Sequence, residues 1–143
     1  MMKIEKGLPP NIEEIKKVFN VDEGVVYTYG DTIYNPTEFD VPNHLMAHEM
    51  EHMRQQGDDP KAWWDRYLVD KVFRQEQEME AYGMQYAYIQ RTFPVRAAKQ
   101  LLFYITRDFA GPIYGNLMSY HEAESLIRHE AKRITALTKT LGV

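Results

Sequence analysis

The chain contains no cysteine, and this absence excludes two kinds of architecture at once. Without thiols there is neither a disulfide framework nor a thiolate zinc site, so a bound metal has to be held by histidine and carboxylate side chains. Apolar runs of membrane-spanning length are also missing, and the opening residues carry no apolar segment of the secretory kind. We therefore expect a cytoplasmic protein with no membrane partner.

A basic stripe is missing as well. The 17 Lys and Arg residues are scattered along the chain and the net charge is -4, which argues against nucleic acid as the main partner. Hydrophobic residues make up 44% of the chain and aromatic residues 13%, proportions typical of a globular protein. We see no internal repeat or linker, so the 143 residues predict one domain that spans residues 1–143.

The first half of the chain predicts a short helix and a small β-hairpin. Residues 1–24 read as an N-terminal arm followed by a short helix through Phe19, opened by a capping box at Asn11 and Glu14. Residues 25–34 are rich in β-branched and aromatic side chains around the turn residues Gly30 and Asp31, which predicts a hairpin.

The rest of the chain predicts helices. We expect one over residues 43–56, a helical region over residues 59–91 with a break near Asp70, and further helices over residues 94–143. Ser119 and Glu122 form a second predicted capping box. The apolar face of the final helix is expected to comprise Ala123, Leu126, Ile127, Ile134 and Leu137. The predicted fold class is α+β, mostly α, with a small sheet before the first long helix.

The most informative segment of the chain reads His48-Glu49-Met50-Glu51-His52, which matches the pattern H-E-x-x-H. Histidines four residues apart on a helix project from one face, so both imidazoles can bind a single Zn²⁺ at about 2.0–2.1 Å. Glu49 lies about 100° further round the helix, beside the metal. A carboxylate in that place can take a proton from a water molecule at the metal.

A catalytic zinc site needs a third protein ligand, and the candidates are three glutamates on the next long helix, Glu76, Glu78 and Glu80. We centre the apolar face of that helix on Val72, Met79 and Tyr86. This phase places Glu76 about 60° from the centre of the face, and Glu78 and Glu80 about 100° away on opposite sides. Helical phase alone therefore leaves all three glutamates open.

With these residues the chain resembles the gluzincin metallopeptidases, in particular the small minigluzincins. In that clan the H-E-x-x-H helix is followed by a glutamate ligand on the next helix, often in the context Glu-x-x-Ala, and residues 78–81 match that form. The resemblance covers residues 25–90 and implies a zincin-like core with Glu78 as the third ligand. Tyr82 departs from the clan, where an Asp often binds a histidine N–H. Its phenol oxygen can accept that N–H, or its ring can belong to the core.

The resemblance also implies a His, Tyr or Arg on the oxyanion side of the metal, contributed from beyond the glutamate helix. His121 is our candidate for that role, with Tyr82 as a second one. His44 shares a face with His48 and His52, but the span to His52 is about 12 Å, too long for one ion to bridge. We read His44 as a helix-start residue.

The residues and the resemblance together predict a zinc-dependent peptidase that acts on a peptide or protein, with Glu49 as the general base. Zincin substrates usually pair with a sheet edge, and here residues 32–34 are the expected edge. Two alternatives remain: a zincin-like module that binds metal without turnover, and a helical interaction protein in which the motif is accidental.

Overall fold

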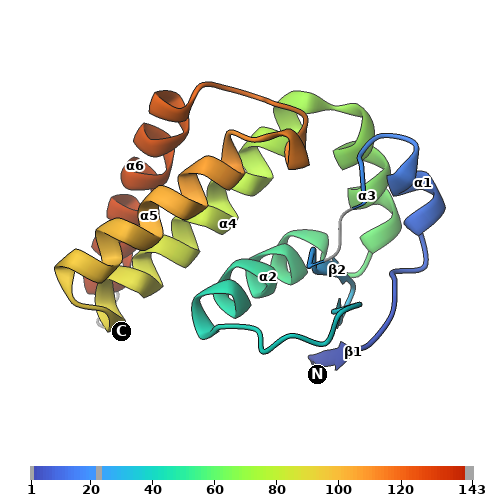
Figure 1. Ribbon diagram of the computed structural model, residues 1–143, viewed down its shortest axis with the longest axis horizontal. Coiled ribbons are helices and arrows are strands. Elements are labelled where there is room, and N and C mark those ends of the chain that lie inside the picture. Colours follow the sequence, from blue (N-terminus) through green and yellow to red (C-terminus); the bar gives the residue numbers. More distant parts are fainter. Residues whose placement is uncertain (1, 22–23, 141–143) are drawn as a thin grey trace.

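The computed structural model describes residues 2–21 and 24–140, so residues 1, 22–23 and 141–143 of the predicted arm and final helix lie outside the described residues. In the described part the chain forms six α-helices and a three-stranded sheet, which confirms a mostly α class (Figure 1). The helices are α1 Ile12–Lys16, α2 Asn43–Gln56, α3 Pro60–Val69, α4 Lys71–Thr92, α5 Val95–Phe109 and α6 Tyr120–Thr140. A short 3-10 turn, Pro112–Tyr114, links α5 to α6.

The sheet has the order β1-β3-β2, with β1 at Lys3–Glu5, β2 at Tyr27–Tyr29 and β3 at Thr32–Tyr34. Strands β2 and β3 form the predicted hairpin around Gly30, whose φ of 65° suits a tight two-residue turn. Strand β1 pairs in parallel with β3 and was not predicted, because three exposed residues carry no pattern. The prediction that β3 is an edge strand is wrong, since it lies between β1 and β2, which are the two edges of the sheet.

Capping explains where most of the helices begin. The side chains of Asp59 and Asp70 each accept a backbone N–H from the first turn of α3 and α4, at 3.0 Å, and the second of these caps produces the predicted break at Asp70. Ser119 caps α6 in the same way at 3.2 Å. The predicted capping box at Asn11 is wrong, because the Asn11 side chain makes no capping bond. Helix α1 also ends at Lys16, before Phe19.

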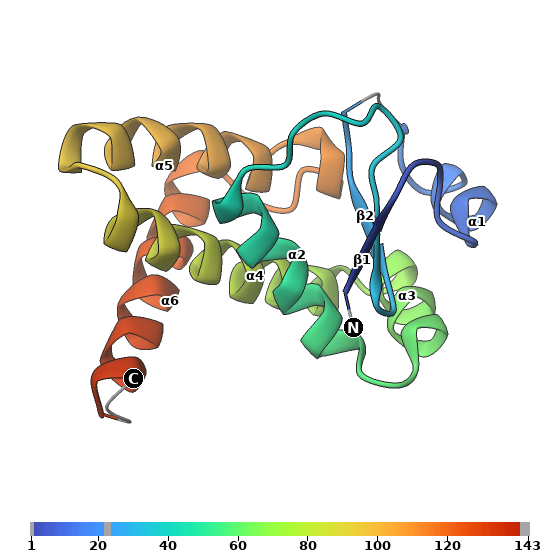
Figure 2. The ribbon, with the colours of Figure 1, turned by 90° about the horizontal axis from the view of Figure 1, so that it is seen from below.

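The hydrophobic core of the described residues has two parts. The first packs α4 against α5 and α6, and the second packs α1, β2 and α3 together. Most of the predicted face of α6 joins the first part, but Leu137 is 47% exposed. Figure 2 shows why, since the last turns of α6 extend past the other helices. In the described part of the chain no helix is long and apolar enough to cross a membrane.

Helices α4 and α6 cross closely at a single glycine. A Cβ atom placed on Gly83 would lie 2.9 Å from Glu130 Cβ, nearer than real side chains approach. Gly83 therefore allows α6 to pack directly on the middle of α4, while α2 lies along α4 with β2 on its other side (Figure 2). The fold thus holds α4 between α2 and α6.

Candidate metal centre

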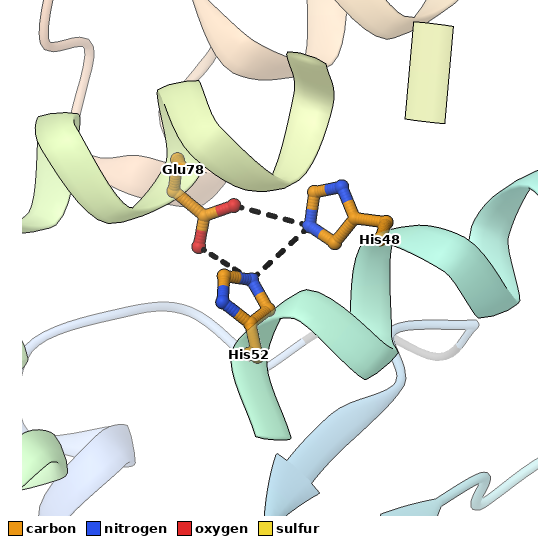
Figure 3. Close-up of side chains that lie close together, drawn as sticks. All are labelled: His48, His52 and Glu78. Atoms are coloured by element: carbon orange, nitrogen blue, oxygen red, sulfur yellow. Dashed lines mark hydrogen bonds and ion pairs between the residues drawn. The ribbon is translucent and has the colours of Figure 1, made fainter. Parts of the chain in front are cut away.

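Two helices bring three metal-binding side chains together in the interior. Helix α2 presents His48 and His52, and Glu78 faces them from α4 (Figure 3). The two Nε2 atoms are 3.2 Å apart, and each lies 3.2 Å from one oxygen of Glu78. All three residues are buried, at 2%, 6% and 2% exposed in sequence order. This group can hold a metal ion.

Hydrogen bonds on the far side of each imidazole fix its tautomer. The Nδ1 atom of His52 lies 2.8 Å from Gln55 Oε1, and the amide of Gln55 is oriented because its Nε2 donates to the Gln77 carbonyl at 2.9 Å. The Nδ1 atom of His48 lies 3.0 Å from Gln85 Oε1. Amide oxygens only accept, so both Nδ1 atoms carry the proton. Each neutral imidazole then turns the lone pair of its Nε2 toward the other and toward Glu78.

This arrangement is unfavourable unless a cation lies at its centre. Two nitrogen lone pairs and a carboxylate would otherwise face one another in a buried site, and Glu78 Oε1 is a buried atom with no hydrogen-bond partner. Ligands held at 2.0–2.1 Å in a tetrahedron are about 3.3 Å apart, close to the 3.2 Å between the two Nε2 atoms, and Glu78 presents Oε1 to His48 and Oε2 to His52 at the same distance. The residues present therefore fit a tetrahedral metal ion.

The electrostatics of the group also favour positive charge. Burial alone would lower the pKa of His52, but the charge of Glu78 and the hydrogen bond to it raise that pKa to about 9. Burial alone would raise the pKa of Glu78, but the charge of His52 and the close approach of both imidazoles hold it well below its usual range. In the absence of metal the group would thus keep a proton where a cation fits.

Glu49 lies beside the group and is held by the sheet. The hydroxyl of Thr28 on β2 donates to Glu49 Oε1 at 2.9 Å, and Oε2 lies 3.6 Å from His48 Nε2. The carboxylate is thus oriented by a neighbouring strand, and one oxygen is directed to the metal-binding group. Glu49 therefore lies beside the group of three and is not one of its members.

Glu78 is oriented by a tyrosine of α3. The hydroxyl of Tyr67 donates to Glu78 Oε2 at 2.7 Å, and burial with the nearby Glu78 charge raises the pKa of Tyr67 well above its usual value. Arg74 supports this corner, because its guanidinium donates to the carbonyls of Tyr67, Leu68 and Tyr114. The buried guanidinium of Arg74 thus holds the end of α3 in place and is not part of the metal-binding group.

The other two candidate third ligands lie outside the group. Glu76 is exposed, and Glu80 accepts a hydrogen bond from Gln55 Nε2 at 3.1 Å, so it supports His52 indirectly. The predicted apolar face of α4 is wrong, since Val72 is 69% exposed. The buried face follows Glu78, Tyr82, Gln85 and Ile89. Its polar members are buried against α2, which an apolar pattern cannot reveal.

Of the two roles left open for Tyr82, the structure shows the core one, and in the described residues its hydroxyl accepts no histidine N–H. The Tyr82 ring packs edge-on against His48 at 4.4 Å between centroids, while its hydroxyl is paired with that of Tyr114 at 2.7 Å. Gln85 accepts the His48 N–H in its place. His121 is exposed near the start of α6 and packs against the ring of Tyr120, so it does not line the cavity at the metal-binding group.

Two residues of α2 differ from their predicted roles. His44 does begin the helix, but its Nδ1 also accepts a hydrogen bond from Gln85 Nε2 at 2.9 Å, which links it to His48. Glu51, to which the sequence assigns no role, is only 7% exposed and pairs with Arg54. Burial raises the pKa of Glu51, and the bond to Arg54 acts against that rise.

Sequence reasoning missed Thr28, Gln55, Tyr67, Gln85 and Tyr114. Of these five residues, Gln55 was the easiest to predict, because it follows His52 by three residues on one helix face. The other four come from β2, α3, α4 and the turn after α5, and no local pattern relates them to the motif.

Comparisons of the chain with protein-family models, curated proteins and solved structures find no match.

Proposed function

We propose that this protein is a zinc-dependent peptidase with His48, His52 and Glu78 as metal ligands and Glu49 as general base. The observation that carries the proposal is the convergence of two Nε2 lone pairs and one carboxylate, with 3.2 Å between the two nitrogens and from each nitrogen to one carboxylate oxygen. A second carboxylate is held beside them. A purely structural site needs no such second carboxylate. The hairpin before α2 and the glutamate on α4 also agree with a zincin-like core.

Zinc suits the donor set because it accepts imidazole and carboxylate ligands, and three protein ligands leave one position open in catalytic sites. When bound, the ion would polarise a water molecule and a peptide carbonyl. The residues of the chain supply the proton transfer. Glu49, held by Thr28, takes a proton from the attacking water and returns it to the leaving amine.

Tyr114 is the group that we assign to the carbonyl oxygen of the substrate, in place of His121. It lines the same cavity as His48 and Glu49. Burial and the nearby charge of Glu78 raise the pKa of Tyr114 well above its usual value, so its hydroxyl stays protonated and can donate. Its pairing with Tyr82 holds the ring in place.

The first test concerns the metal. We expect about one Zn²⁺ per chain by elemental analysis of protein purified with zinc supplied, and its loss in His48→Ala and His52→Ala. Less than a tenth of an equivalent in the zinc-supplied wild type would leave the accidental-motif alternative.

The second test separates an enzyme from a binding module. Glu49→Gln should retain zinc and the circular dichroism spectrum of the wild type but lose peptide hydrolysis, because a general base contributes about 10²–10⁴-fold to the rate. A mixed peptide library, read for new termini by mass spectrometry, measures hydrolysis. Zinc-loaded wild type that cuts no peptide would favour the module, and cleavage that persists in Glu49→Gln would remove Glu49 from its role.

A further inference from the structure

The metal-binding group opens into a cavity of about 80 Å³ between α1, α3, β2 and the turn after α5. Both tryptophans of the chain line it. Its aromatic lining comprises Phe19, Tyr27, Trp63, Trp64, Tyr67 and Tyr114. An enclosed water molecule needs about 10–15 Å³ of such volume, so the cavity has room for one side chain and is too small for a larger ligand.

Hydrogen bonds inside the protein engage the polar tips of this aromatic lining. The indole of Trp63 donates to Gln77 Oε1 at 2.7 Å, and the indole of Trp64 donates to the Thr28 carbonyl at 2.9 Å. The hydroxyl of Tyr67 is bonded to Glu78, as described above. These rings therefore present carbon to the cavity, and a guest gains mainly from apolar contact.

Apart from the two histidines of the metal-binding group, the charged side chains in the lining are carboxylates. Glu49 and Glu78 line the cavity, and among the described residues no Lys or Arg does so. A guest with a carboxylate therefore meets like charge and no cation, apart from a bound metal ion. The cavity thus disfavours acidic side chains and offers no cationic side chain to anchor a free C-terminus.

The neighbouring edge of β2 is largely occupied. In a two-residue hairpin, the backbone groups of Thr28 and Gly30 point away from β3. The Thr28 carbonyl already accepts from Gln56 Nε2 at 2.8 Å and from the Trp64 indole at 2.9 Å, and the Gly30 N–H donates to Gln56 Oε1 at 2.7 Å. A substrate strand therefore cannot pair along β2 beyond Thr28.

From these observations we infer that the aromatic cavity is a side-chain pocket that selects internal peptide segments with a large apolar residue next to the cleaved bond. This inference rests on the proposed peptidase function. Side-chain burial in the pocket, and not extended pairing with the sheet edge, supplies the recognition. Burying a Phe or Leu side chain in place of Ala should change affinity about 10- to 100-fold.

Intrinsic fluorescence can test the pocket without turnover, because both emitting tryptophans line the cavity. The zinc-loaded Glu49→Gln protein is titrated with blocked peptides, acetyl-Ala-Ala-Ala-X-Ala-Ala-Ala-amide, where X is Phe, Leu, Ala or Glu. We expect a saturable change with the Phe and Leu peptides at a Kd at least tenfold below that of the Ala peptide. The Glu peptide should bind most weakly. Wild type should cut the Phe and Leu peptides beside X.

Matched variants locate the effect. Phe19→Ala and Ile113→Ala, which alter the cavity lining, should reduce the preference for Phe, whereas Phe103→Ala, on the exposed face of α5, should leave it unchanged. The circular dichroism spectrum identifies any variant that is not folded, and the two lining variants lie in separate segments, one after α1 and one in the turn after α5.

The outcomes separate this inference from the proposed function. Wild type that cuts the Ala, Phe and Glu peptides equally well overturns the pocket and leaves the peptidase. Preferential binding of the Phe peptide without cleavage by wild type supports the pocket and rejects the peptidase. No fluorescence change with any of the four peptides overturns the pocket.

Discussion

At the scale of single residues, two glutamine amides decide which nitrogen each histidine turns toward the metal. Gln85 and Gln55 accept the Nδ1 protons of His48 and His52, so both Nε2 atoms face inward. Partners of this kind commonly hold ligand rings in place and raise metal affinity. The amide of Gln85 is itself oriented by His44.

Replacing Gln85 should therefore weaken metal binding without removing a ligand. We expect Gln85→Leu to lower zinc affinity about 10- to 100-fold, measured by competition with a chromogenic chelator. Gln90→Leu, an exposed change on the same helix, is the control. Equal affinities in the two variants would show that the Gln85 bond does not orient His48.

The choice of third ligand is a second prediction at this scale. Glu78→Gln should lower zinc affinity by orders of magnitude, because it removes the one carboxylate that, among the described residues, is grouped with both imidazoles. Glu76→Gln and Glu80→Gln should leave affinity nearly unchanged in the same assay. If zinc is lost in Glu76→Gln or Glu80→Gln instead, Glu78 is not the third ligand, although the protein still binds zinc.

How far the sequence predicts the site depends on whether its residues share an element. His48, Glu49 and His52 follow from periodicity within one helix. Glu78 required a resemblance, because its helical phase relative to α2 is a tertiary property. Thr28 and Gln85 were beyond reach, since each is ordinary on its own element and gains its role only where β2 and α4 meet α2.

At the scale of elements, the close crossing of α4 and α6 holds the helix that carries Glu78. The sequence predicted both helices from their caps and spacing, yet not this contact, because a single Gly within a helix reads only as a weak position. The break before α4 was predictable because Asp70 is a strong cap. The three-residue strand β1 was not, because its stability comes from pairing with β3.

Gly83→Ala provides a test in which two effects have opposite signs. Helix propensity alone favours Ala by about 1 kcal/mol, whereas overpacking against Glu130 on α6 costs typically 1–3 kcal/mol. We expect the collision to win, with a net loss of about 1 kcal/mol in urea unfolding. Ala62→Gly, at an exposed position of α3, measures how much helix propensity alone contributes to the free energy of unfolding. If Gly83→Ala is instead more stable than the wild type, α6 can shift to make room for the methyl group at little cost in free energy.

At the scale of the whole molecule, the metal-binding group joins the two parts of the core. Tyr82 of the first part packs against His48, and Tyr67 of the second part donates a hydrogen bond to Glu78, so the group contacts both parts. A ligand that binds only the folded state adds its binding free energy to stability.

Metal removal should therefore lower Tm. At a free zinc concentration of 100 times Kd the stabilisation is about 2.7 kcal/mol, or roughly 5–10 °C for a chain of this size. Thermal unfolding with zinc and with excess chelator measures the shift, and His48→Ala should show almost none. Identical curves for zinc-loaded and chelated wild type would contradict this role for the site.

The hydrogen bonds of Gln56 to the hairpin have a consequence outside the cavity. Open strand edges are templates on which other chains can add strands and begin to aggregate. One side-chain amide bonds both the Thr28 carbonyl and the Gly30 N–H, and so occupies positions that an incoming strand would need. The opposite edge is the short strand β1, which carries the charges of Lys3 and Glu5. The small sheet is thus poorly suited to grow from one molecule into the next.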